Sequence, residues 1–159
     1  MDTSVEIIEK SMDVVKTLQL INKYSTKKST LNAIARKVMC SREREKFQNL
    51  MRNLDVHCEV QKQQCVTYMA GIWATKEALY KSMTHFIPPH DMLPAQMIYT
   101  KLFYKSNNQI TGAPQVQIVN PLTTECQLLY EKYLKDTNIL LSISHDGEYL
   151  IAYTSICAS

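Results

Sequence analysis

Glycine is scarce in this chain, which has only Gly71, Gly112 and Gly147 among its 159 residues. A P-loop and a dinucleotide-binding turn each need several glycines within a short segment, so neither can be assembled here. If the protein binds phosphate, then cations, a metal ion or helix N-termini must hold it.

The chain also lacks a run of about 18 apolar residues, the length that spans a bilayer. Its N-terminal segment, MDTSVEIIEK, contains acids and no arginine, unlike a signal or transit peptide. We therefore expect no membrane association, and either a cytosolic protein or one whose targeting segment is already missing.

Charge of one sign is not concentrated, and the cysteines form no obvious framework. A net charge of +3 is too weakly basic for a dedicated nucleic-acid binder, so we expect no nucleic-acid partner. An odd number of scattered cysteines favours reduced thiols over disulfides, and their spacing disfavours a zinc site. They are Cys40, Cys58, Cys65, Cys126 and Cys157.

The composition is that of a globular protein, with 45% hydrophobic and 21% charged residues. The length fits one domain over residues 1–159, without repeats or linkers. Residues 5–8 are expected to begin a strand that runs towards Asp13. Apolar residues then recur at helical spacing over 14–21, before a polar break at 25–29.

Three later segments are predicted to be helices. Ser41 is expected to be the N-cap of the first, with Glu43 in its first turn. The best-defined helix covers about 66–83 and carries small residues that would let a neighbouring element approach closely. A capping box then predicts a helix over 124–135.

Two hairpins complete the predicted fold. The first joins a strand at 97–104 to one at 115–119. The second joins 139–144 to 149–156 around Asp146-Gly147, a strong two-residue turn signal. Helices mixed with hairpins indicate the α+β class, with a mainly antiparallel sheet packed against a long helix.

Two acids stand out as candidates for chemistry. Asp13 follows a predicted strand, and Glu77 lies inside the strongest helix, one turn before Lys81. Two carboxylates from separate elements are typical of a magnesium site, because this ion takes one or two carboxylates together with phosphate oxygens. The alternative is a simple helix cap at Asp13 and an exposed ion pair between Glu77 and Lys81.

Other polar groups are more ambiguous. Three consecutive residues, Ser144, His145 and Asp146, cannot align side chain to side chain as a catalytic triad. His145 is then either a polar residue at the end of a strand or a ligand contact. A basic cluster is either a solvated face or a docking surface for an acidic partner. It consists of Arg36, Lys37, Arg42, Arg44 and Lys46.

Four segments, spread over most of residues 5–156, stand out together. The most specific is Trp73-Ala74-Thr75-Lys76-Glu77-Ala78 followed by Tyr80-Lys81. The others are Met12-Asp13-Val14-Val15, the stretch from Arg36 through Glu43 to Phe47, and Leu141-Ser142-Ile143-Ser144-His145 followed by Tyr149. In order and spacing they resemble the holo-acyl-carrier-protein synthase type of 4'-phosphopantetheinyl transferase, and the first is similar to that family's W-x-x-K-E-A helix and its later lysine.

This resemblance implies the 4'-phosphopantetheinyl transferase fold and transfer of phosphopantetheine from coenzyme A to a serine of an apo acyl carrier protein. It implies that Asp13 and Glu77 hold magnesium on the pyrophosphate, and that Glu77 or a metal-linked water helps to deprotonate the serine. Lys81 would stabilise the departing 3',5'-ADP. His145 would contact the nucleotide, with Lys76 and Ser144 as further coenzyme A contacts.

The same resemblance implies a homotrimer with the site between neighbouring subunits. Fatty-acid carrier modification in the mitochondrial matrix, or in the cytoplasm, is the expected setting. The competing hypothesis is a scaffold subunit that binds a carrier protein without turnover, and a nucleic-acid adaptor is a distant third.

Several departures from the family pattern affect the expected coenzyme A phosphate contacts and the docking surface, and two of them, Ile72 and Lys16, prompt the scaffold hypothesis. Glycines around the aspartate are replaced, an acid and an arginine are missing, and docking bases on the first helix are few. The residues at these positions are Glu9, Ser11, Lys16, Gln19, Ile72 and Thr84-His85-Phe86.

Overall fold

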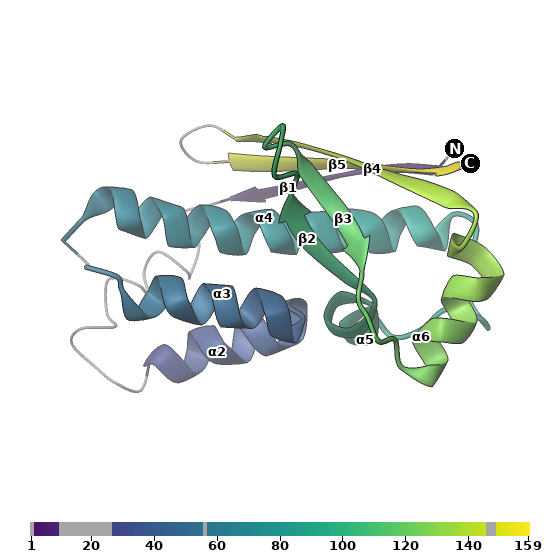
Figure 1. Cartoon of the computed structure of the whole chain (residues 1–159), viewed down its shortest axis with the longest axis horizontal. Coiled ribbons are helices and arrows are strands. Elements are labelled where there is room, and N and C mark those ends of the chain that lie inside the picture. Colours follow the sequence, from purple (N-terminus) through teal and green to yellow (C-terminus); the bar gives the residue numbers. More distant parts are fainter. Residues whose placement is uncertain (1, 10–26, 56, 146–148) are drawn as a thin grey trace.

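The computed structural model describes residues 2–9, 27–55, 57–145 and 149–159, arranged in three layers (Figure 1). A sheet covers one side of the long helix α4, and helices α2 and α3 lie on its other side. The helical segments are α2 (Lys27–Val38), α3 (Ser41–Arg52), α4 (Glu59–Thr84), α5 (Ala95–Met97), η1 (Ile98–Leu102), α6 (Thr124–Leu129) and η2 (Tyr130–Leu134). The strands are β1 (Asp2–Glu9), β2 (Phe103–Asn107), β3 (Pro114–Ile118), β4 (Thr137–His145) and β5 (Tyr149–Ala158).

The main sheet is antiparallel, with the order β1-β5-β4 and the C-terminal strand in the middle. Thr154 of β5 stands opposite Leu141 of β4 on one side and Ser4 of β1 on the other. Alternate residues of β5 are buried, as expected for a strand with one face on a helix. The α+β class and the sheet on a long helix are therefore confirmed, as is the β4–β5 hairpin, whose turn lies outside the described residues.

Small residues of α4 let the sheet approach closely, as the sequence predicted. Ala70 and Ala74 pack against Leu150 and Ala152 of β5. A Cβ added at Gly71 would lie 3.9 Å from Leu150 Cδ1, an ordinary van der Waals contact, so an alanine would also fit there. The helix begins at Glu59 rather than near residue 66, because its first turns are polar and leave no apolar period to detect.

The opposite side of α4 packs on α3 and α2. Phe47 of α3 and Met69 of α4 are both fully buried in this core. The N-cap of α3 is Cys40, one residue before the predicted Ser41. Helix α2 was not predicted, since its first residues fall in the polar stretch taken as a break. The expected helix over 14–21 lies outside the described residues.

One predicted strand is wrong. Residues 97–102 form the end of α5 and the π-helical turn η1, so only residues 103–104 of the predicted stretch belong to a strand, β2. Pro94 begins the helical segment, and Ile98 and Leu102 then bury one face of it. The β2–β3 hairpin itself is present, and the helix predicted over 124–135 begins with Thr123 as N-cap, whose Oγ1 accepts from Cys126 N at 3.3 Å.

All five cysteines are free, in line with the reduced thiols expected from the sequence. Within the described ranges, none of the helices has both the length and the apolar character needed to cross a bilayer.

Candidate active site

Glu77 lies in the C-terminal half of α4 and is only half-buried. Trp73, one turn earlier, donates its indole Nε1–H to Glu77 Oε1 at 2.5 Å. Residues four apart lie on the same side of a helix, so this bond fixes the direction in which the carboxylate points. A hydrogen bond to a carboxylate is stronger than one between two neutral groups, so this bond restrains the Glu77 side chain.

Lys81 follows Glu77 by one helical turn and its side chain is exposed. The predicted placement of this acid and this base on one side of the helix is therefore confirmed. Their spacing allows an ammonium group and a carboxylate to contact the same polyanionic substrate from one surface.

Lys76 has surroundings opposite to those of Lys81. Its side chain is 1% exposed, and its ammonium donates to Glu43 Oε1 at 2.9 Å, to Phe103 O at 2.6 Å and to Tyr99 O. An ammonium has three hydrogens, so all of them are used inside the protein. Burial lowers the pKa of Lys76, an effect that the Glu43 carboxylate opposes. A coenzyme A phosphate would find no remaining donor here, which does not fit the contact expected from the sequence.

Glu43 is the residue that sequence reasoning missed as a partner. It is buried in the first turn of α3, where its Oε1 also accepts from Cys40 N at 2.9 Å. Its Oε2 accepts from Lys105 N of β2 at 2.7 Å. The capping pattern signals a helix start, but nothing in the sequence indicates that a lysine 33 residues later completes the pair.

Ser144 and His145 end β4, opposite Ile151 and Leu150, and both are exposed. This end of the sheet lies towards the N-terminal half of α4, at the left of Figure 1, whereas Glu77 lies in the C-terminal half. His145 stands opposite Leu150, which packs against Ala70 and Ala74 of α4. Asp13, the other expected metal ligand, lies outside the described residues.

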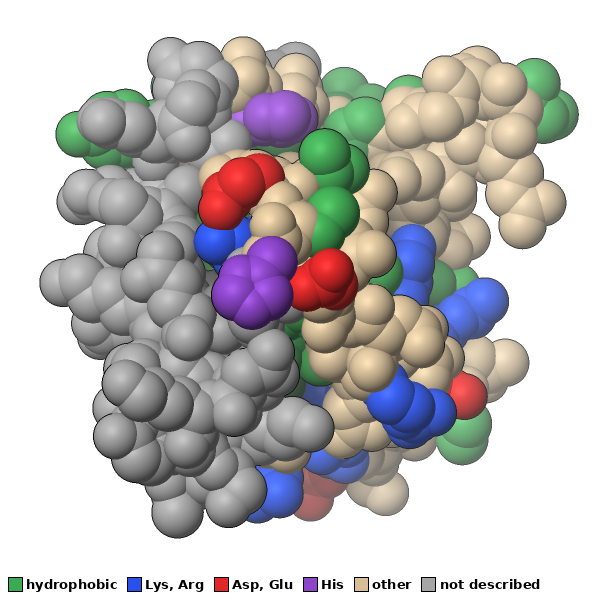
Figure 2. Space-filling view, turned by 90° about the vertical axis from the view of Figure 1, so that its left-hand side faces the viewer, with side chains coloured by type: hydrophobic (Ala, Val, Ile, Leu, Met, Phe, Trp, Pro, Cys, Tyr) green, Lys and Arg blue, Asp and Glu red, His purple; other side chains and the backbone are tan. Residues whose placement is uncertain are grey.

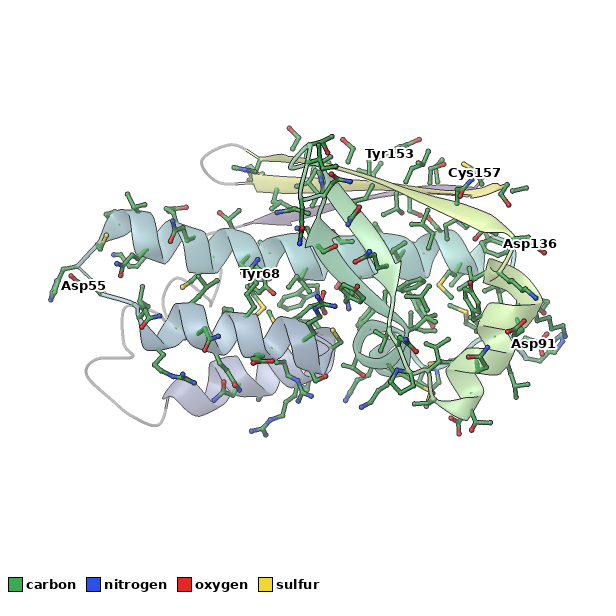
Figure 3. All side chains as sticks on the ribbon, in the orientation of Figure 1. Asp55, Tyr68, Asp91, Asp136, Tyr153 and Cys157 are labelled. Carbon is green, nitrogen blue, oxygen red and sulfur yellow. The ribbon has the colours of Figure 1, made fainter. Side chains whose placement is uncertain are left out.

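Acidic and histidine side chains gather at the end of the molecule where the α3–α4 loop lies (Figure 2). Asp55 projects from this loop (Figure 3) and accepts from His57 N at 2.9 Å. In the described ranges, however, no group of three or more His, Cys, Asp or Glu side chains is placed to hold a metal ion. Of the two residues expected to bind magnesium, only Glu77 lies within the described residues.

The basic cluster is mostly exposed at the end of α2 and on α3. Arg42 lies with its guanidinium carbon 4.9 Å from the centre of the Tyr104 ring. The position at which the resemblance expects an arginine, Ile72, is fully buried in the core between α4 and α3. An apolar side chain suits this position because a charged one would need a buried partner.

Comparison with known proteins agrees with the fold. Residues 12–154 match the model of the 4'-phosphopantetheinyl transferase superfamily. The chain is 34% identical over 135 residues to the mitochondrial holo-[acyl-carrier-protein] synthase of Saccharomyces cerevisiae, covering 81% of this chain and 75% of that protein. It is 40% identical over 92 residues to the protein of the same name from Candida glabrata, covering 57% and 58%.

Solved structures share the fold at lower identity. The ACPS–CoA complex of Chronobacterium ammoniagenes superposes with a TM-score of 0.59 at 20% identity, covering 99% of this chain and 97% of that one. A holo-(acyl-carrier-protein) synthase from Bacillus anthracis in complex with CoA (3',5'-ADP) gives a TM-score of 0.57 at 16% identity, covering 99% and 96%. The family match over most of the sequence shows that this chain belongs to the 4'-phosphopantetheinyl transferase superfamily.

Proposed function

We propose that this protein transfers 4'-phosphopantetheine from coenzyme A to a serine of an apo acyl carrier protein and releases 3',5'-ADP, with magnesium as the metal ion. The observation that carries the proposal is the side of α4 on which Trp73 orients Glu77 and Lys81 follows one turn later. The relatives named holo-[acyl-carrier-protein] synthase support the same reaction.

Glu77 and Asp13 are the residues that would hold magnesium. Carboxylate oxygens are the ligands that this ion prefers, and the described one is half-buried and oriented, so it fits the role. When bound, the ion would neutralise charge on the pyrophosphate oxygens.

The remaining steps belong to the chain and its substrates. The carrier serine oxygen attacks the β-phosphorus of coenzyme A, and its proton passes to Glu77 or to water. The bond from this phosphorus to the oxygen bridging it to the α-phosphate breaks, and the electron pair leaves with 3',5'-ADP. Lys81 would donate to the departing phosphate. Because Lys81 and Glu77 act by orienting the substrates and stabilising charge, positioning and charge stabilisation would supply most of the catalysis. Ser144 and His145 are proposed to contact the nucleotide.

A homotrimer would bring the end of β4 to the α4 site of a neighbouring copy. The sheet supports this, because its face away from α4 exposes Val5, Leu140, Tyr149, Ile151 and Tyr153. Val5 and Tyr153 are direct cross-strand partners, and Tyr149, Ile151 and Tyr153 alternate along the same face of β5, so these four side chains form a continuous apolar surface. An exposed apolar surface of this kind is typical of a protein interface, and a second and third copy of this chain are the proposed occupants.

The names of the relatives also support a setting in the mitochondrial matrix. The carrier protein of fatty-acid synthesis is the proposed substrate there.

Mass spectrometry tests the reaction directly. Purified protein with magnesium and coenzyme A should add one phosphopantetheine to an apo carrier protein. Glu77→Gln should lower the rate on the order of 100-fold or more, because a group that stabilises transition-state charge is lost. Glu131→Gln, an exposed acid of η2, is the matched control and should change nothing. Normal transfer by Glu77→Gln would overturn the site.

The scaffold alternative rests on Ile72, since a buried apolar residue supplies no cation for a phosphate. It predicts carrier-protein binding without consumption of coenzyme A. Calorimetry with coenzyme A and magnesium separates the two, because only the transferase should bind the nucleotide.

A further inference from the structure

On the side of α4 that faces α3, η1 and β2 lies a buried charged pair that the proposed reaction does not use. Lys76 and Glu43 are 1% exposed at their side chains and lie 2.9 Å apart. Removing two charges from water is costly, and well-packed apolar residues in place of such a pair often stabilise a protein as well or better. Stability alone therefore does not explain this pair.

Its hydrogen bonds join four elements at one point. Glu43 binds the α3 start through Cys40 N and strand β2 through Lys105 N. Lys76 donates from α4 to Tyr99 O in η1 and to Phe103 O at the start of β2. These two carbonyls lie where the helical turn becomes a strand. Lys76 of α4 thus satisfies both carbonyls, and its hydrogen bonds attach α4 to η1, to β2 and, through Glu43, to α3.

The pair is directly next to the proposed active site in sequence. Consecutive residues of a helix point about 100° apart, since a turn contains 3.6 residues. Anchoring Lys76 therefore sets the rotation and the axial position of α4 at Glu77. The bond from Trp73 then sets the direction of the Glu77 carboxylate itself.

We propose that Lys76 and Glu43 are positioning residues for Glu77, which hold α4 in the one rotation that aims its carboxylate at the metal ion and substrate. The inference rests on the proposed function only for the role of Glu77. It predicts that loss of the pair changes the surroundings of Glu77 even where the fold survives.

Trp73 reports on those surroundings, because it is the only tryptophan in the chain and is bonded to Glu77. The variants are Lys76→Met, and Lys76→Met combined with Glu43→Gln, which removes both charges and keeps a cap acceptor for Cys40 N. The matched control is Lys135→Met with Glu131→Gln, which removes the same two charges from an exposed pair 3.5 Å apart.

Three measurements are made on each folded variant: Trp73 emission without ligands, Mn²⁺ affinity in the presence of coenzyme A followed by that emission, and transfer kinetics. We expect the double variant to regain thermal stability over Lys76→Met. Its Trp73 emission should shift, its Mn²⁺ affinity should fall about 10- to 100-fold as for other supporting residues of metal sites, and kcat should fall with little change in the carrier KM.

A double variant with wild-type emission, Mn²⁺ affinity and kcat would overturn the inference and leave the pair a purely structural role. If the double variant does not fold, Glu43→Gln alone gives the same test, with the same shift expected and unchanged values as the contrary result. If the wild-type protein transfers nothing, the proposed function fails, whereas the emission shift without ligands still decides whether the pair controls Glu77.

Discussion

The two faces of the β1-β5-β4 sheet have similar side chains and opposite surroundings. On the inner face, Leu150, Ala152 and Ile156 of β5 are buried against α4 and its neighbours. On the outer face, five large apolar side chains are 39–57% exposed: Val5, Leu140, Tyr149, Ile151 and Tyr153. Figure 3 labels Tyr153 and Cys157 on this side, away from α4.

Within the described residues, the outer face of the sheet keeps several large apolar side chains exposed, whereas the inner face is covered. An antiparallel sheet with one solvated face normally alternates apolar and polar residues. Here β5 carries isoleucine on both faces, at Ile151 and Ile156. The inner face is covered by α4 and the elements that share its core, while the outer face is assigned to the proposed neighbouring copies.

The largest effect should come from charge on the outer face. Ile151→Lys combined with Tyr153→Lys would bury two ammonium groups in the proposed interface, at a cost of several kcal/mol each. We expect sedimentation to show a single chain in place of an assembly, and transfer activity to be lost with it. Gln109→Lys, at an exposed turn position, is the control. An unchanged assembly would contradict the proposal that neighbouring copies cover the outer face of the sheet.

A matched pair of isoleucines on β5 sharpens the contrast. Ile156→Ala leaves a cavity in the inner core and should lower the free energy of unfolding by about 2–5 kcal/mol at any protein concentration. Ile151→Ala should act through assembly, so that its effect on Tm depends on protein concentration. Urea and thermal unfolding at two concentrations check both. Equal, concentration-independent losses would show that both faces are covered within one chain.

The sequence predicted the elements whose causes are local. The β4–β5 hairpin follows from strand alternation and its Asp-Gly turn, and α3 from its cap and first-turn acid. The C-terminal half of α4, with Glu77 and Lys81 on one side, follows from helical spacing and from the family resemblance. Each of these depends on residues only a few positions apart.

The features that the sequence did not predict depend on distant partners. The β-rich stretch at 97–102 is helical because its apolar residues fill the core and because Lys76 donates hydrogen bonds to the carbonyls of Tyr99 and Phe103. Lys76 was expected at a phosphate because the family motif does not reveal Glu43. The meeting of Asp13 with Glu77 stays a prediction, since Asp13 lies outside the described residues.

A smaller effect concerns the polar contact that attaches the inner face to α4. Ser82 Oγ and Thr154 Oγ1 are both buried and lie 3.0 Å apart. Thr154→Val should cost about 1–3 kcal/mol, because it leaves the serine hydroxyl without this partner. Adding Ser82→Ala should recover part of the loss, and a double-mutant cycle by urea unfolding measures the coupling. Additive losses would show that the hydroxyl pair does not attach the sheet to the helix.

The smallest effect should come from the contact of Asp91 with η2, the helical turn before β4, because this contact lies on neither face of the sheet. Asp91 accepts from Lys132 Nζ at 2.8 Å and from the Tyr133 hydroxyl of η2, and these bonds hold the pKa of its carboxyl below the ordinary 3.8. A lowered folded-state pKa contributes stability above the unfolded value, and this contribution disappears as the pH falls through the folded value. Asp91→Asn should therefore differ from wild type by a small, constant amount near pH 7, and the difference should shrink only below about pH 4. Thermal unfolding as a function of pH measures this, and assembly should not change, because a partly exposed ion pair acts locally. A difference that vanishes already at pH 6, or a change in oligomeric mass, would mean that this contact supports the outer face after all.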